Sequence, residues 1–151
     1  MMLALIFLAL EPSAAFARLR SLVGDWEART DQGGIIRVSY RLVSNDSVLV
    51  QRFVTPSGKE TLTVFHPDGA RLIATHYCAQ GNQPRLRLDP ASAKDRFVFT
   101  FLDATNLPKP SAAHLVRLEL QLETATQYTE IETYQEDGKP DVTTLHFKRV
   151  R

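Results

Sequence analysis

Hydrophobic and polar residues alternate with a period of two along most of the chain. Segment 36–42 shows this clearly, because Ile36, Val38, Tyr40 and Leu42 are separated by two arginines and a serine. Such alternation is typical of strands that bury one face and expose the other. The pattern predicts ten strands, at residues 26–30, 36–42, 48–54, 61–66, 71–78, 85–89, 97–102, 116–122, 127–135 and 142–150.

The connections between these segments are mostly short and rich in turn-forming residues. Segments 31–34 and 67–69 both contain glycine, and the one longer loop, 104–113, carries two prolines. Short loops join antiparallel neighbours, and a meander of this size removes its exposed edges by closing. We therefore predict an all-β fold, an antiparallel up-and-down β-barrel of about ten strands, wide enough to hold a ligand.

A short amphipathic helix is predicted over residues 12–22, ahead of the first strand. Pro12 suits the first turn of a helix, and Phe16, Leu19 and Leu22 recur at helical spacing before Gly24. We expect this helix to act as a lid or plug on the barrel.

The first ten residues, M-M-L-A-L-I-F-L-A-L, are apolar but too few to span a bilayer. They resemble the hydrophobic part of a signal peptide, although no Lys or Arg precedes them. We interpret residues 1–11 as a signal-peptide remnant or a disordered apolar terminus, and residues 12–151 as the barrel domain. This predicts a periplasmic or secreted protein, with a cytoplasmic one as the alternative, and a segment 1–10 that is dispensable for folding.

The overall charge argues against a polyanionic partner. The chain has 18 basic and 17 acidic side chains, and the net charge of +1 gives no basic face for nucleic acid. The ordinary apolar fraction of 44% fits a single globular domain. We expect a monomer or weak homodimer without stable membrane insertion.

The densest group of reactive side chains lies in segment 75–85, T-H-Y-C-A-Q-G-N-Q-P-R. A scaffold of strands with one such segment favours a binding site there. The alternative is a structural network in which these side chains hydrogen-bond the neighbouring loops. The candidate ligand-binding residues are His76, Tyr77, Cys78, Asn82, Gln83 and Arg85, joined by His114 at the start of a later strand.

Arg85 has two possible roles, because Arg85 and Arg87 share one face of a short strand. If that face points inward, the guanidinium of Arg85 would anchor an anionic head group; if it points outward, both arginines are solvated.

A catalytic role for segment 75–85 is a competing interpretation. His76 and Cys78 share a strand face, yet no orienting acid or oxyanion motif accompanies them. A haem- or gas-binding barrel is a third interpretation, but the parity of His146, the late-strand histidine that could hold haem, points it outward. The four histidines show no metal-binding spacing, so we expect neither a metal nor another cofactor.

Several motifs together resemble a bacterial family of lipocalin-like (calycin-type) β-barrels, a domain of unknown function. They are G-x-W at Gly24–Trp26, T-V-F-H-P-D-G at 63–69, T-H-Y-C-x-x-G-N-Q-P-R at 75–85, and F-x-F-x-D-A-T-N at 99–106. The resemblance covers residues 12–151. It implies a barrel with a shared site and no established activity. It also implies that Trp26 lies under an arginine of the last strand, Arg149 or Arg151, as a cation–π pair.

The function predicted from the sequence is the binding of a small, largely apolar molecule inside the barrel, without chemical conversion. An anionic head group is expected if Arg85 faces the ligand. The alternatives are a hydrolase or isomerase that uses His76, Tyr77 and Cys78, and a haem- or gas-binding barrel.

Overall fold

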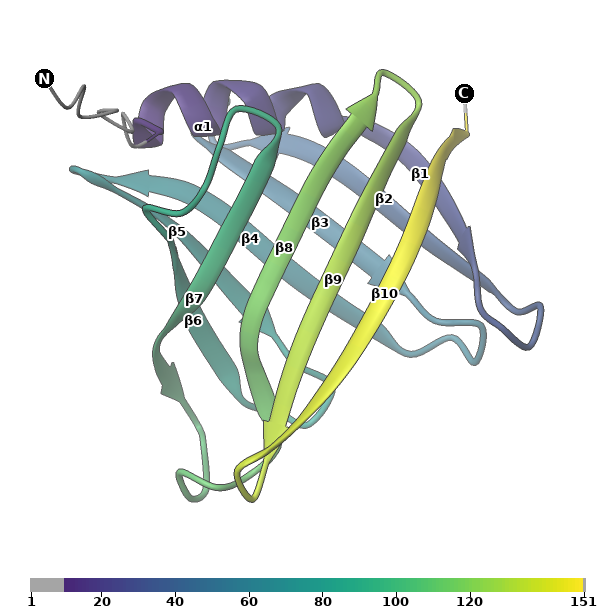
Figure 1. Cartoon of the computed structure of the whole chain (residues 1–151), viewed down its shortest axis with the longest axis vertical. Coiled ribbons are helices and arrows are strands. Elements are labelled where there is room, and N and C mark those ends of the chain that lie inside the picture. Colours follow the sequence, from purple (N-terminus) through teal and green to yellow (C-terminus); the bar gives the residue numbers. More distant parts are fainter. Residues whose placement is uncertain (1–9, 151) are drawn as a thin grey trace, which may run out of the picture.

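The computed structural model describes residues 10–150, which form a closed ten-stranded antiparallel barrel with one short N-terminal helix (Figure 1). The predicted fold class is therefore confirmed. Helix α1 spans Pro12–Leu19 and continues as a 3₁₀ turn over Arg20–Leu22. The strands are β1 (Gly24–Arg29), β2 (Ile35–Val43), β3 (Val48–Val54), β4 (Glu60–Asp68), β5 (Arg71–Tyr77), β6 (Gln83–Leu88), β7 (Arg96–Thr105), β8 (His114–Thr124), β9 (Gln127–Glu136) and β10 (Lys139–Val150).

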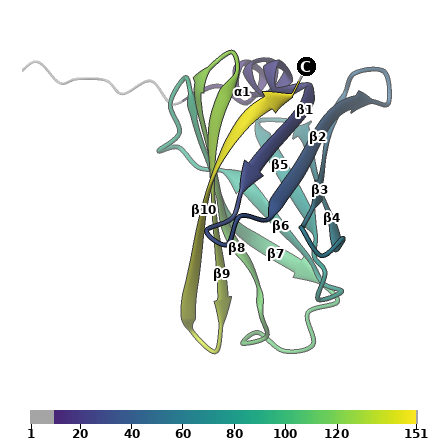
Figure 2. The same ribbon diagram turned by 90° about the vertical axis from the view of Figure 1, so that its right-hand side faces the viewer.

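Each strand pairs with its neighbours in the chain, and β1 closes the barrel against β10. The β1–β10 ladder has only three residue pairs, Asp25–Val150 to Glu27–Lys148, whereas β10 and β9 share ten. Figures 1 and 2 show β10 running beside β1 near the helix and diverging from it farther down. The barrel is thus joined firmly at the helix end and flares toward the other end.

Helix α1 covers the narrow end of the barrel. It packs on β4 and β5 through a buried face formed by Ala15, Phe16 and Leu19, which are at most 7% exposed. Leu10, just before the helix, also packs against the core. The predicted plug is therefore present, and we call this end the closed end.

Trp26 is buried beneath the helix, and the contact predicted with Arg149 is present. The guanidinium carbon of Arg149 lies 4.2 Å from the centre of the Trp26 ring, while the indole N–H donates to the carbonyl of Leu22 at 2.7 Å. Arg149 also donates to the carbonyls of Ser21 and Val23, both at 2.8 Å. One side chain of the last strand thereby ties together the helix end and the first strand.

The opposite end of the barrel, which we call the open end, is formed by turns and the one long loop. They are residues 30–34, 55–59, 78–82, 106–113 and 137–138, and no helix of the described chain lies there.

The strand register shifts at two places near the open end. One lies between β6 and β7 at Arg85–Leu86, and the other in β8 between Leu115 and Arg117. Strand β8 also begins at His114 and β10 at Lys139, earlier than the alternation predicts.

The prediction for residues 1–11 falls mostly on residues 1–9, which lie outside the described part of the chain. In residues 10–150 no helix has the length and apolar character needed to cross a membrane.

Candidate functional site

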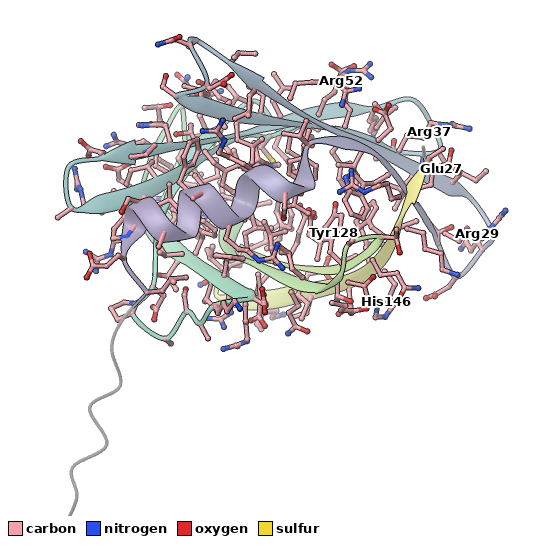
Figure 3. The ribbon with its side chains drawn as sticks, turned by 90° about the horizontal axis from the view of Figure 1, so that it is seen from above. Glu27, Arg29, Arg37, Arg52, Tyr128 and His146 are labelled. Carbon is pink, nitrogen blue, oxygen red and sulfur yellow. The ribbon has the colours of Figure 1, made fainter. Side chains whose placement is uncertain are left out.

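Strand β9 lines the barrel interior with polar residues. Tyr128, Glu130, Glu132 and Tyr134 alternate along the strand and share one face. That face points inward, because Tyr128 and Glu130 lie opposite the buried Phe147 and Leu145 of β10 and are themselves at most 1% exposed. Figure 3 shows Tyr128 inside the barrel, in contrast to Arg52 on the outer wall.

The middle of the barrel is crossed by hydrogen bonds between β9 and the opposite wall. The amide of Gln51, on β3, donates to Glu130 Oε2 at 2.7 Å and to the hydroxyl of Tyr40 at 2.9 Å. The hydroxyl of Tyr128 lies 3.4 Å from the same carboxylate oxygen. These groups are all fully or almost fully buried, so each bond forms where the dielectric is low.

Nearer the open end, His76 joins β5 to β4 and β9. Its Nδ1 is hydrogen-bonded to the hydroxyl of Thr63 and its Nε2 to the hydroxyl of Tyr134, both at 3.0 Å. Burial lowers the pKa of His76 to about 4, so the imidazole is neutral at pH 7. The ring therefore serves as a hydrogen-bonding bridge and carries no charge.

Within residues 10–150, neither inward carboxyl group has a cationic partner. Burial raises the pKa of Glu132 to about 7. Burial and the nearby charge of Glu132 raise the pKa of Glu130 well above its ordinary value. The second oxygen of Glu130, Oε1, is buried without a hydrogen-bond partner. We call Tyr40, Gln51, Thr63, His76, Tyr128, Glu130, Glu132 and Tyr134 the luminal array.

A hollow of about 640 Å³ lies at the open end, and we call it the mouth pocket. Its volume falls within the range of small-molecule sites. Tyr134 lines this pocket and hydrogen-bonds His76, so the pocket adjoins the luminal array. The pocket is lined by Gln80, Ala113, Tyr134, Gln135, Glu136, Asp137, Lys139, Pro140, Asp141 and Thr143.

The segment 75–85 contributes to this region through only part of its length. His76 belongs to the luminal array. Cys78 is 8% exposed; its thiol contacts the amide oxygen of Gln80 and lies 3.8 Å from the hydroxyl of Tyr134. Asn82 is buried and donates to the carbonyl of Ala113 at 2.9 Å, which ties turn 78–82 to the long loop. From this segment Gln80 lines the mouth pocket, while His76 and Cys78 contact Tyr134, which lines it too.

The other half of the segment lies outside the barrel. Tyr77 is 47% exposed. Arg85 is exposed and makes a two-point ion pair with Asp103, its register partner on β7. The prediction that Arg85 anchors an anionic group in the cavity is therefore wrong, because its guanidinium faces solvent and its charge is already matched.

Gln83 holds the turn in place. Its amide donates to the carbonyl of Gly81 at 3.0 Å, and its oxygen accepts from Thr105 at 2.8 Å and Asn106 at 2.6 Å. These bonds use both ends of the Gln83 amide, so the side chain organises the rim of the barrel.

His114 also lies at the rim. It is 6% exposed, its ring centre is 5.0 Å from that of Phe101, and its Nδ1 is 2.6 Å from the carbonyl of Ala112. It is thus held by its own loop and by β7.

His146 faces away from the interior, as its parity predicted. It is exposed on β10 and hydrogen-bonds Thr129 at 2.9 Å (Figure 3). Within residues 10–150, no three side chains of the His, Cys, Asp or Glu type are grouped so that they could hold a metal ion.

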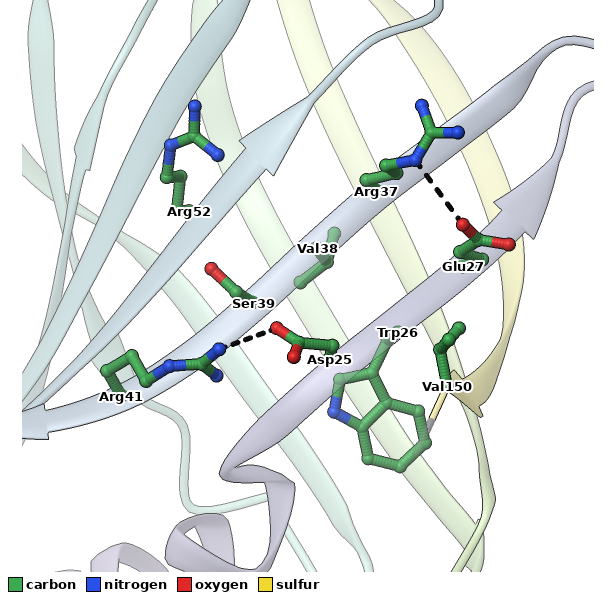
Figure 4. A pocket seen from close by; sticks show the side chains of 9 residues that line it. All are labelled: Asp25, Trp26, Glu27, Arg37, Val38, Ser39, Arg41, Arg52 and Val150. Atoms are coloured by element: carbon green, nitrogen blue, oxygen red, sulfur yellow. Dashed lines mark hydrogen bonds and ion pairs between the residues drawn. The ribbon is translucent and has the colours of Figure 1, made fainter.

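A second hollow, of about 310 Å³, lies on the outer wall across β1 and β2 (Figure 4). Its arginines are matched by acids: Arg41 bonds Asp25 at 2.6 Å, and Arg37 lies 3.3 Å from Glu27. Exposed ion pairs of this kind contribute little to binding or stability. We therefore regard this outer-wall pocket as a feature of the charged surface.

Most of the luminal array was not identified from the sequence. The available signal was in β9, where tyrosines and glutamates share one parity and Thr129, Ile131 and Thr133 take the other. Charged residues on the same face as aromatic ones in a strand indicate an inward polar surface. No family model and no curated protein matches this chain, so the candidate site rests on its own geometry.

Proposed function

We propose that this protein binds a small amphipathic molecule at the open end of the barrel, without converting it. The ligand would occupy the mouth pocket and reach down to the luminal array. The observation that carries this proposal is a pocket of about 640 Å³ that adjoins buried hydrogen-bonding groups, with Tyr134 shared between them. Concave sites with a few convergent polar groups are typical of small-molecule binding.

The surroundings of the array suit a molecule with an apolar part. Leu115 lies opposite Tyr134, and Leu118 lies opposite Glu132, both on β8. Apolar side chains therefore flank the polar groups where the mouth pocket meets the interior. An amphipathic ligand could therefore place its apolar part against the leucines of β8 and its polar part against the hydrogen-bonding groups of β9.

The geometry favours binding over catalysis. With a pKa of about 4, His76 is a poor base at neutral pH. Its two ring nitrogens bond Thr63 and Tyr134, and the thiol of Cys78 bonds Gln80 and Tyr134. Neither His76 nor Cys78 thus has the other as its hydrogen-bond partner, as a nucleophile and its base would.

A pair of pocket-filling variants tests the proposal. Ala113→Trp would fill the mouth pocket, and Ser39→Trp would fill the outer-wall pocket as a matched control. Binding of the uncharged dye Nile red is measured by fluorescence, and protein from its own host is examined by native mass spectrometry for a co-purifying molecule. We expect Ala113→Trp to lose dye binding and Ser39→Trp to retain it. Equal binding by both variants, or none by the wild type, would contradict the proposal.

A further inference from the structure

Two carboxyl groups inside the barrel are left with unused bonding capacity. Glu130 is completely buried; Gln51 and Tyr128 bond its Oε2, but its Oε1 has no partner. Glu132, two residues along the same face, is partly accessible, and among residues 10–150 it makes no hydrogen bond or ion pair. Such groups are costly unless something satisfies them.

A neighbouring strand shows how this protein treats a buried carboxylate that has no ligand role. Glu119 on β8 is 5% exposed and receives bonds from Arg96 at 2.7 Å and Arg117 at 3.0 Å. Despite the opposing effect of burial, these bonds lower the pKa of Glu119. Within residues 10–150, no Lys or Arg bonds Glu130 or Glu132, so these two carboxyl groups lack the compensation that Arg96 and Arg117 give Glu119.

The entrance to these carboxyl groups is acidic as well. Tyr134 and Thr143, which line the mouth pocket, flank Glu132 along β9 and across on β10. The mouth pocket has three acidic side chains, Glu136, Asp137 and Asp141, against one lysine, Lys139. Asp137 also lies 3.8 Å from Lys109, so the excess of acidic charge is modest; such an excess favours ligands of the opposite sign.

We infer that the polar head of the ligand is a protonated amine, held by Glu132 and by the free oxygen of Glu130 beneath the mouth pocket. This inference rests on the proposed function and specifies its ligand class. An ammonium group offers three N–H donors and one positive charge, which suits two unsatisfied carboxyl oxygens. The ring of Tyr134, the next residue on this face toward the mouth pocket, adds a face for a cation–π contact.

A bound cation would also act on the charge state of the pair. Burial raises the pKa of Glu132 to about 7, and burial with the charge of Glu132 raises that of Glu130 well above its ordinary value. A positive charge beside Glu132 would favour its ionised form. The titratable groups around it, Tyr40, Tyr128 and Tyr134, have raised pKa values, mainly through burial, and stay neutral.

The test compares three probes of equal length, octylamine, octanol and octanoate, as competitors of Nile red at pH 7.5. In the wild type we expect octylamine to bind at least tenfold more tightly than octanol, and octanoate to bind most weakly. Glu132→Gln should weaken octylamine about ten- to a hundredfold, as loss of a charged bond does, and leave octanol unchanged. Glu60→Gln removes an exposed charge from the outer face of β4 and serves as the control.

The outcomes separate the two proposals. If octanol and Nile red bind but octylamine has no advantage, or Glu132→Gln leaves octylamine unaffected, the amine inference fails and the proposed function stands. If no probe binds the folded wild type, both fail. Should Glu132→Gln not fold, Glu132→Asp keeps the charge while moving it back by one methylene, and a loss of affinity confined to octylamine is expected.

Discussion

Gly24, at the start of β1, lies directly against the side chain of Arg149 near the end of β10. Its φ of +137° lies in the region that favours glycine, and a Cβ there would overlap the guanidinium of Arg149. Arg149 stacks on Trp26 and bonds the backbone of the segment that precedes β1. A side chain at Gly24 would therefore disturb both the local backbone and the closure of the barrel.

We predict that Gly24→Ala destabilises the protein more than Gly58→Ala. Gly58 also has positive φ, at +83°, but its Cβ would meet nothing within 4 Å. Gly58→Ala should cost about 1–2 kcal/mol from backbone strain alone, and Gly24→Ala clearly more, because Arg149 must also move. Urea unfolding of both variants measures the difference. Equal losses would show that Arg149 moves aside at no cost.

His76 and Glu132 should give opposite pH dependences of stability. The folded pKa of His76, about 4, is below its unfolded value of 6.5, so its contribution is lost as pH falls toward 4. The folded pKa of Glu132, about 7, is above its unfolded value of 4.5, so its contribution is lost as pH rises toward 7. Between pH 4.5 and 6.5 the two effects partly cancel.

Single variants should separate these effects. Relative to wild type, Glu132→Gln should gain stability as pH rises from 5 to 7, and His76→Gln should lose it, by roughly 1–3 kcal/mol in each case. Denaturant midpoints at pH 5, 6 and 7 provide the measurement, with Glu60→Gln as a control that changes the same charge on the outer face. Parallel pH profiles for all variants would contradict the assigned environments.

At the scale of elements, β1 and β10 close the barrel through a short ladder that side chains reinforce. Only three residue pairs join them. Trp26 compensates: it stacks under Arg149, meets the ring of Tyr128 edge-on at 4.8 Å and bonds Leu22. A large aromatic residue thereby replaces backbone pairing as the main link among helix, first strand and last strand.

Trp26→Ala is expected to cost about 3–5 kcal/mol, the usual loss for a buried large aromatic residue. Tyr77→Ala removes an aromatic ring that is 47% exposed on the outer wall and should change stability little. Chemical denaturation measures both, and hydrogen exchange should show β1 and β10 opening first in Trp26→Ala. A Trp26→Ala variant as stable as Tyr77→Ala would refute this role.

At the scale of the whole molecule, the barrel has two different ends. Helix α1 and apolar side chains fill the closed end, while the open end carries the mouth pocket and its acidic rim. A bound molecule should therefore protect one end only.

We predict that saturating octylamine slows hydrogen exchange in turn 78–82, loop 106–113 and turn 137–138, and leaves α1 unchanged. At a hundredfold excess over its Kd, it should stabilise the fold by about 2.7 kcal/mol. Exchange measured by mass spectrometry locates the protection. Protection centred on α1, or on the outer wall at Arg37 and Arg41, would place the ligand elsewhere.

The sequence by itself determined the strands, their order and the closure of the barrel. Alternation is local, since each residue's face follows from its neighbours in the same strand, and short loops leave antiparallel pairing as the only arrangement. The contact of Trp26 with an arginine of the last strand was implied by the resemblance around G-x-W, which left Arg149 and Arg151 open, and it agrees with the closure of a meander, which brings the first and last strands together. His76, Cys78 and Asn82 could also be identified from the sequence, because polar and reactive side chains are concentrated in one short segment.

Only the tertiary structure decided which faces meet and which groups remain unsatisfied. Alternation showed that Arg85 and Arg87 share a face, but only the pairing of Arg85 with Asp103 on β7 shows that this face is the outer one. The register shift in β8 likewise puts Leu115 opposite Tyr134 and breaks the parity that extended to His114. Glu130 and Gln51 are 79 residues apart and meet across the lumen. Such partners depend on the curvature and register of the closed sheet, which no local pattern of residues encodes.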